Sequence, residues 1–300
     1  MSNTSTPALE KLLARSEAIL EKLEALLPAP PATPDWEAGL AFRWQRYASL
    51  AGLNMPGYLQ HIRQLPGIRL ADLSGIDAQK ARVVANTRQF LSGRPANNVL
   101  LTGSRGSGKS SLVKALLHEF ADQRLRLIEV DKGDLVDLPQ LIDCIAERPE
   151  YFIIFCDDLS FEAGESAYKA LKVALDGGIA TMPANTLIYA TSNRRHLMPE
   201  YFTENLESTR RSSQSGEEIH PGESSEEKIS LSERFGLWIS FYPFSQEDYL
   251  AIVGYWLKHF GCGESQAARQ DALNWAIQRG SRSGRVAWQF ARDWAGTHGS

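Results

Sequence analysis

At 300 residues, the chain is long enough for one large domain or two small ones. Its content of 43% hydrophobic and 23% charged residues is typical of a globular protein and excludes a disordered or fibrous one. The net charge of −4 provides no overall attraction to nucleic acid or acidic lipid, so any such binding would need a local basic patch.

The cysteines and the apolar runs indicate a reducing, cytoplasmic setting. Cys144, Cys156 and Cys262 form no CxxC pair, so neither a disulfide framework nor a zinc site is predicted. The N-terminus carries charged residues among its leucines and lacks the uncharged core of a signal peptide. No apolar run approaches the ~18 residues of a membrane-spanning helix. We therefore expect a cytoplasmic protein without a membrane partner.

The first predicted element is a helix from Thr6 to Leu27, because leucines recur there at alternating three- and four-residue steps. This helix either packs on its own domain or mediates self-association. Prolines then form a stiff linker, and we assign residues 1–34 to the helix and linker. Residues 35–71 are predicted to form a helical N-terminal extension. The side chains that suggest a helix there are Trp36, Leu40, Phe42, Trp44 and Tyr47.

Residues 72–243 alternate short apolar runs with segments of helix length, which predicts an α/β sheet covered on both faces. The buried, mainly parallel strands are expected at residues 99–101, 127–130, 152–156, 187–190 and 238–241. Residues 203–228 interrupt this rhythm with Ser, Thr and Glu and few aliphatic residues. They are predicted to be a mobile insertion, with a compact surface loop as the alternative.

The remaining residues, 244–300, are predicted to form a helical lid subdomain. Ser245 and Asp248 have the spacing of a capping box, which marks the start of its first helix.

The strongest motif fits GxxxxGK[ST] and reads Gly103-Ser104-Arg105-Gly106-Ser107-Gly108-Lys109-Ser110. It directly follows an apolar run and opens a helix that begins at Ser111, as a phosphate-binding loop requires. In such a loop, backbone N–H groups and the helix N-terminus face phosphate oxygens. We therefore predict that this loop and Ser111 bind ATP. Lys109 is expected to contact the β- and γ-phosphates, and Ser110 to ligate Mg²⁺.

Polar residues follow two further predicted strands. Asp157 and Asp158 come directly after the apolar run that ends at residue 156, at the edge where open α/β sheets bind ligands. Asp157 is expected to hold Mg²⁺ through water, and Asp158 to orient or activate the attacking water; capping of the next helix is the alternative. Asn193 follows the run at residues 187–190, where a polar side chain can reach the γ-phosphate or that water.

The order of Lys109, Asp157 and Asn193 resembles the Walker A, Walker B and sensor-1 order of AAA+ ATPases. The double aspartate is similar to that of the bacterial replication-initiator branch. This resemblance implies that Arg234, within Leu231-Ser232-Glu233-Arg234-Phe235-Gly236, is an arginine finger. Such a guanidinium can fork onto phosphate oxygens, and a surface salt bridge is the alternative.

The resemblance extends to both ends of the nucleotide-binding segment. Arg285 is implied to be sensor 2, with Arg282 as the second candidate, because both stand in the segment that opens the last helix. Leu73 and Ile76 lie in a segment similar to the one that covers the adenine in AAA+ proteins.

The chain resembles one bacterial AAA+ family in particular, the ATP-binding proteins of domain of unknown function 815 (DUF815). The stretches that carry this likeness are residues 156–162, 190–197 and 226–231, and it extends from about Trp36 to Ala295. It implies a fold and nucleotide chemistry but no substrate.

Together these observations predict a three-layer α/β/α P-loop NTPase with a mainly parallel five-stranded sheet and a C-terminal helical lid. We expect an Mg²⁺-dependent ATPase that forms a homo-oligomer, with its arginine finger acting in trans on a protein or nucleic-acid client. A small-molecule kinase and a slow nucleotide-dependent switch or scaffold are the alternatives. The basic pairs Arg194-Arg195 and Arg210-Arg211 are interpreted as solvated surface charge, with nucleic-acid or subunit contact as the alternative.

Overall fold

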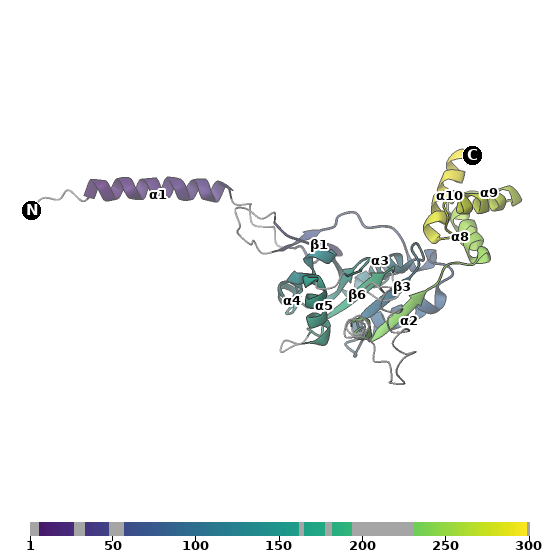
Figure 1. Ribbon diagram of the computed structural model, residues 1–300, viewed down its shortest axis with the longest axis horizontal. Helices are drawn as coiled ribbons and strands as arrows, with labels where there is room; N and C mark the ends of the chain where they lie inside the picture. The colour runs from purple at the N-terminus through teal and green to yellow at the C-terminus, as the bar shows by residue number, and fades with distance from the viewer. Residues whose placement is uncertain are drawn as a thin grey trace, which may run out of the picture.

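The computed structural model of the chain describes residues 6–26, 34–47, 57–161, 165–177, 182–193 and 231–298. Within them a seven-stranded sheet carries helices on both faces, and three helices are grouped at the C-terminal end (Figure 1). The predicted insertion at 203–228 and the basic pairs Arg194-Arg195 and Arg210-Arg211 lie outside the described residues.

The sheet has the strand order β2-β1-β4-β5-β6-β3-β7, and only the pair of β1 and β2 is antiparallel. The strands are β1 Ala41–Gln45, β2 Tyr58–His61, β3 Val99–Gly103, β4 Leu125–Glu129, β5 Tyr151–Cys156, β6 Thr186–Ser192 and β7 Leu237–Phe241. All five predicted strands are present as β3 to β7. The order reverses at β3, which lies between β6 and β7, and open α/β sheets bind ligands at such a point.

The predicted helix around Trp36 to Tyr47 is wrong, because this segment contributes β1 instead. The described residues thus hold two strands more than the five predicted. Residues 35–71 contain β1, β2 and the start of the short 3₁₀ helix η1 (Leu70–Asp72). Phe42 and Trp44 are buried while Arg43 between them is exposed, which is the two-residue period of a strand. Parallel pairing with β4 accounts for the strand conformation of this segment.

Alternate residues of the central strands pack into two separate cores, one on each face of the sheet. Ile153 and Phe155 of β5 face one core, and Ile154 and Cys156 face the other. The first core is covered by α2 (Asp77–Leu91) and α3 (Lys109–Phe120), with the 3₁₀ helix η2 (Ala121–Gln123) following α3. The second is covered by η3 (Lys132–Asp137), α4 (Leu138–Ile145) and α5 (Ser166–Asp176).

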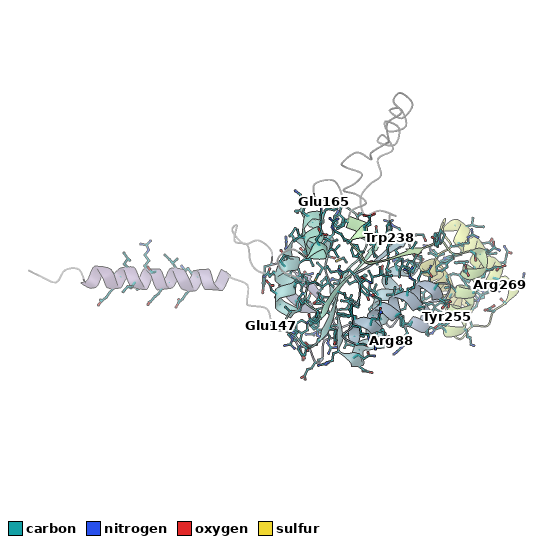
Figure 2. All side chains as sticks on the ribbon, turned by 90° about the horizontal axis from the view of Figure 1, so that it is seen from below. Arg88, Glu147, Glu165, Trp238, Tyr255 and Arg269 are labelled. Atoms are coloured by element: carbon teal, nitrogen blue, oxygen red, sulfur yellow. The ribbon has the colours of Figure 1, made fainter. Side chains whose placement is uncertain are left out.

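The C-terminal helices are α8 (Gln246–His259), α9 (Gln266–Gln278) and α10 (Gly284–His298). The predicted capping box begins α8, since the Ser245 hydroxyl accepts from the Asp248 N–H at 3.0 Å and the Asp248 carboxylate accepts from the Ser245 N–H at 3.2 Å. Figure 2 shows Tyr255 of α8 where these helices meet the α/β layers, and its hydroxyl donates to Asp72.

Every described side chain of the N-terminal helix α1 (Thr6–Leu26) is exposed. The exposed fractions of Leu12, Leu13 and Ile19 are 65%, 53% and 51%. Packing of this helix on its own domain is therefore not observed for these side chains, and self-association stays a prediction. Among the helices that the structure describes, none has the length and apolar character needed to cross a membrane.

Candidate active site

The predicted phosphate-binding loop connects β3 to α3 at the carboxyl edge of the sheet. Three of its glycines, Gly103, Gly106 and Gly108, have a positive φ, and at the first two a Cβ would also collide with a neighbouring segment. Gly103 has a φ of +131°, and a Cβ there would lie 1.9 Å from the main-chain oxygen of Phe241 on the neighbouring strand. Gly106 has a φ of +71°, and its Cβ would lie 2.7 Å from the side chain of Ser283. The loop is therefore pressed between the sheet and the segment that precedes α10.

Lys109 opens α3 and points back across this loop. Its Nζ donates to the main-chain oxygens of Gly103 and Ser104, at 2.9 and 2.8 Å, and to Asn193 Oδ1 at 3.0 Å. Only 5% of Lys109 is exposed. Burial lowers the pKa of its ammonium below the usual value, and the nearby carboxylates of Asp158 and Asp157 act in the opposite direction. The ammonium is thus held in a largely buried position beside two carboxylates.

The two aspartates after β5 have different partners. Asp157 Oδ1 accepts from the hydroxyls of Ser110 and Thr191, each at 2.6 Å. Asp158 Oδ1 accepts from Asn193 Nδ2 at 2.5 Å. Asp158 is exposed, whereas Asp157 is half-buried between α3 and β6.

The predicted residues from three segments therefore form one hydrogen-bonded network, which we call the Lys109 network. Its members are Lys109, Ser110, Asp157, Asp158 and Asn193. They stand 84 positions apart at most in sequence, and the parallel order of β3, β6 and β5 brings them to one edge.

The side-chain oxygens of Ser110 and Asp157 are suitable ligands for Mg²⁺. A hydroxyl and a carboxylate oxygen lie 2.6 Å apart there, and Mg²⁺ prefers oxygen ligands. Within the described residues, no group of three or more His, Cys, Asp or Glu side chains gathers to hold a metal. A site with one or two protein oxygens suits Mg²⁺, which keeps several waters and substrate oxygens as ligands.

The segment before α10 lies against the tip of the loop. The Gly284 N–H donates to the Gly106 main-chain oxygen at 2.9 Å. The Cβ of Arg285 would lie 3.7 Å from a Cβ on Gly106, while Arg282 lines a neighbouring open cavity of about 750 Å³ together with Ser104 and Arg105. Both candidates for sensor 2 are thus placed at the loop, and both are exposed.

The predicted adenine-covering residues, Leu73 and Ile76, lie near the end of the phosphate-binding loop at Gly108. Leu73 and Ile76 are buried in the core that α3 covers. The Cδ1 of Ile76 lies 3.3 Å from the position of a Cβ on Gly108. Lys80 holds the segment by donating to the main-chain oxygen of Leu73 at 2.9 Å. The remaining loop residues Ser107 and Ser111 are buried and half-buried, respectively.

Arg234 lies outside the Lys109 network. It stands in the turn before β7 and forms an ion pair with Asp176, the last residue of α5. Its side chain is 23% exposed.

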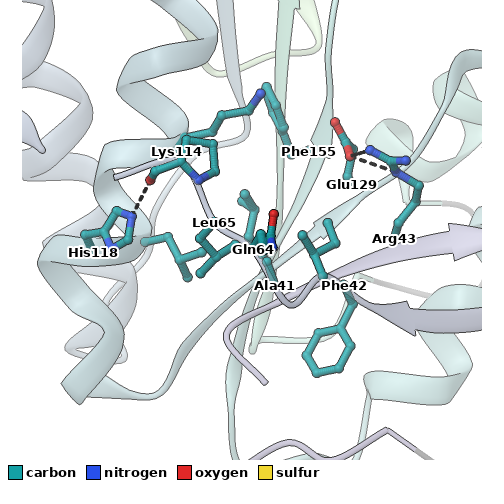
Figure 3. A pocket seen from close by; sticks show the side chains of 13 residues that line it. Ala41, Phe42, Arg43, Gln64, Leu65, Lys114, His118, Glu129 and Phe155 are labelled. Atoms are coloured by element: carbon teal, nitrogen blue, oxygen red, sulfur yellow. Dashed lines mark hydrogen bonds and ion pairs between the residues drawn. The ribbon is translucent and has the colours of Figure 1, made fainter. Parts of the chain in front are cut away.

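A second, smaller cavity lies beneath the opposite end of α3, between that helix, β1 and β4 (Figure 3). Arg43 pairs there with Glu129, and the His118 ring bonds to the main-chain oxygen of Pro66 at 2.7 Å. None of the residues that line it belongs to the Lys109 network.

Sequence reasoning did not assign Thr191, whose hydroxyl contacts Asp157, although it singled out the strand end that contains it. Its role follows from the strand register, since the parallel pairing of β5 with β6 sets Thr191 beside Asp157.

The sheet order, the loop after β3 and the C-terminal helices are those of AAA+ ATPases, and the chain has the AAA+ α/β fold. A single-residue variant of RuvB from Thermotoga maritima superimposes with a TM-score of 0.50 at 15% identity, covering 77% of this chain and 66% of that one. Another RuvB variant gives 0.50 at 17% identity, covering 78% and 68%. A chain in the E. coli MS115-1 HORMA:CdnC:Trip13 complex gives 0.47 at 13%, covering 75% and 90%.

Identities this low show a shared fold alone, and this chain spans just under two thirds of the first RuvB variant, 66%. No curated protein matches the sequence. Residues 37–298 match the family described as "Protein of unknown function (DUF815)". The chain belongs to this family, as its signature stretches predicted.

Proposed function

We propose that the protein is an Mg²⁺-dependent AAA+ ATPase whose active site is completed by a neighbouring protomer. The observation that carries this proposal is the Lys109 network, in which groups suited to phosphate, metal and water meet at one sheet edge. A glycine-rich turn with no ligand would have no need to gather an ammonium, two carboxylates and an amide from three segments.

Each member has a role that follows from its contacts. The Lys109 ammonium now bonds to two main-chain oxygens and an amide oxygen, and phosphate oxygens of ATP would replace these neutral partners with charged ones. Ser110 and Asp157 would hold Mg²⁺, which supplies positive charge to the phosphate oxygens. Asp158, exposed at the rim, would orient or activate the attacking water, and Asn193 Nδ2 holds its carboxylate.

The parts outside the network supply closure and coupling. Leu73 and Ile76 would cover the adenine, and Arg285 or Arg282 would reach the phosphates from the C-terminal helices. Because these helices contact the loop through Gly284 and Gly106, loss of the γ-phosphate would change their angle to the sheet. That motion would act on a protein or nucleic-acid client.

Arg234 is proposed to act in trans, as an arginine finger for the nucleotide of the next protomer. The test measures phosphate release per protomer against protein concentration, for the wild type, Arg234→Ala and Asp176→Ala. Asp176→Ala is the matched control, because it breaks the same ion pair and keeps the guanidinium. We expect turnover to rise with wild-type concentration, to fall at least a hundredfold in Arg234→Ala and to survive in Asp176→Ala.

Mixing two inactive variants sharpens this test. Arg234→Ala keeps its own nucleotide site, and Lys109→Ala keeps its arginine, so a mixed assembly contains complete sites only if Arg234 acts across the interface. We expect the mixture to regain turnover that neither variant shows alone. Concentration-independent turnover that Arg234→Ala leaves intact would favour a self-contained P-loop kinase or slow switch instead.

A further inference from the structure

The loop that carries both aspartates is bonded to the end of β6 by the hydroxyls of Thr191 and Ser192, of which Thr191 alone contacts the two aspartates and Ser192 donates to the Leu159 main-chain oxygen at 2.7 Å. The register pairs Cys156 of β5 with Ala190 of β6, so the next residues along each strand, Asp157 and Thr191, stand side by side. The Thr191 hydroxyl donates to Asp157 Oδ1 at 2.6 Å and accepts from the Asp158 N–H at 2.9 Å. A hydroxyl has one hydrogen to donate and lone pairs to accept with, so it can serve both at once.

The backbone of Asp158 explains why this contact matters. Its φ is +51°, in the left-handed region that residues with a Cβ rarely adopt. The bond from its N–H to Thr191 restrains the backbone there. The following residue is held as well, because the Leu159 N–H donates to the Thr191 main-chain oxygen at 2.7 Å.

Both aspartate carboxylates lie at one edge of the sheet, yet they have different partners. Asp157 faces the Ser110 hydroxyl, and Asp158 faces the Asn193 amide. In an extended backbone the two successive side chains would point to opposite faces of the sheet. The left-handed turn at Asp158 keeps both carboxylates at the same edge.

We propose that Thr191 is a positioning residue for the ATPase proposed above, and this inference rests on that function. Its hydroxyl holds both the Asp158 backbone and one carboxylate oxygen of Asp157. The Asp157 carboxylate thereby stays on the metal side, and the Asp158 carboxylate stays on the water side. Thr191 is 1% exposed, so its side chain is covered by protein and is not open to a substrate. Its loss therefore affects the rate of the chemical step and spares nucleotide binding.

Substitution to valine separates this role from packing. Thr191→Val keeps the shape and removes both hydrogen bonds, and Thr191→Ser keeps the hydroxyl and removes a methyl group. The matched control is Thr87→Val. Thr87 of α2 is 0% exposed, and its hydroxyl bonds at 2.9 Å to the hydroxyl of Tyr189. Tyr189 is on β6, the strand of Thr191, but away from the aspartates. Thr87→Val therefore measures the effect of losing a buried threonine hydroxyl that contacts β6 without contacting the aspartates.

The first measurement is steady-state turnover with saturating Mg-ATP, together with equilibrium binding of a non-hydrolysable ATP analogue. We expect Thr191→Val to lower kcat by about ten- to a hundredfold and to change analogue affinity less than threefold. Thr191→Ser should regain most of the lost kcat, and Thr87→Val should remain within about twofold of the wild type. Equal kcat in Thr191→Val and the wild type, or equal losses in the valine and serine variants, would overturn the proposal.

The second measurement needs no ATP. Hydrogen exchange, resolved at single amides in the nucleotide-free full-length protein, should show the Asp158 N–H protected in the wild type and in Thr191→Ser. In Thr191→Val this amide should exchange at least tenfold faster, while the Leu159 amide stays protected because its partner is a main-chain oxygen. Unchanged protection of Asp158 would overturn the positioning role directly.

The kinetic and hydrogen-exchange measurements distinguish a failure of the Thr191 proposal from a failure of the proposed ATPase function. A wild type that releases no phosphate at any protein concentration would overturn the proposed ATPase and with it the kinetic role of Thr191. The exchange arm would still decide whether Thr191 holds the Asp158 backbone. Faster exchange in Thr191→Val with unchanged kcat would show that this restraint has no kinetic consequence, and would overturn the proposal with the ATPase intact.

Discussion

The carboxylates of Asp157 and Asp158 are adjacent in sequence yet have separate environments. Asp157 Oδ1 accepts from two hydroxyls, and Asp158 is exposed and accepts from a single amide. Hydroxyls and a carboxylate are suited to a hydrated metal ion, whereas an exposed carboxylate can reach a water. These environments support the proposal that Asp157 holds the metal and Asp158 orients the water.

Asp158→Asn tests this assignment. The amide keeps the size of the side chain and removes the charge that would accept a proton, so we expect ATP affinity to change less than threefold and kcat to fall by at least a hundredfold. Titration of Mg-ATP and phosphate release measure the two effects. Lys109→Ala is the contrasting variant, in which binding itself should be lost. Asp122→Asn, an exposed carboxylate in η2, should alter neither quantity. Undiminished turnover in Asp158→Asn would remove Asp158 from the mechanism.

At the residue scale, local motifs predict the network and miss what holds it in place. Lys109 and Ser110 follow from the phosphate-loop spacing, and Asp157 and Asn193 from their positions after apolar runs. Thr191 acts through its register with β5 and through a left-handed backbone at Asp158. Neither property is visible without the strand pairing, because Ser and Thr are ordinary residues at the ends of strands.

Contact between the loop and the start of α10 links two elements that are far apart in the chain. The Gly284 N–H donates to the Gly106 oxygen, and Ser283 lies where a Gly106 side chain would be. In the proposed function the same loop binds phosphate, so its backbone would serve both the nucleotide and the C-terminal helices. A side chain at position 106 should therefore weaken both nucleotide binding and the contact with the C-terminal helices.

Gly106→Ala is expected to lower the free energy of unfolding by more than a comparable substitution elsewhere, and to weaken ATP binding at least tenfold. Gly93→Ala is the matched control, because its φ of +67° imposes similar backbone strain while nothing lies within 4 Å of the added Cβ. That strain alone should cost about 1–2 kcal/mol. Denaturant unfolding and ATP titration measure the two effects. Equal destabilisation in both variants, with ATP affinity unchanged, would contradict a functional contact between loop and helix.

The β1 segment shows where element prediction fails. Trp36, Leu40 and Trp44 recur at helical spacing, while Phe42 and Trp44 alternate with a charged residue as in a strand, so the sequence supports both patterns. The five other parallel strands are short, mainly apolar runs bounded by turn or charged residues, which left no such ambiguity. For β1, tertiary pairing with β4 overrides the helical pattern.

At the scale of the whole molecule, the family match covers the α/β layers and the C-terminal helices, residues 37–298. Helix α1 lies outside this match, and its described side chains are exposed. Leucines recur in its sequence at three- and four-residue steps, and the described side chains of Leu12, Leu13 and Ile19 are exposed, which favours a helix that pairs with a copy of itself. Its contribution should therefore appear in assembly and not in the stability of one protomer.

Removal of residues 1–34 tests this division of roles. Side chains that are exposed in the protomer stabilise it little, so the thermal unfolding midpoint of residues 35–300 should stay within about 2 °C of the full chain. If α1 brings protomers together, the protein concentration that gives half-maximal phosphate release should rise at least tenfold, while the plateau turnover stays the same. The plateau is unchanged because the Lys109 network and Arg234 are all retained. A lowered unfolding midpoint would show that α1 packs on its own domain, and an unchanged half-maximal concentration would assign assembly to the α/β layers alone.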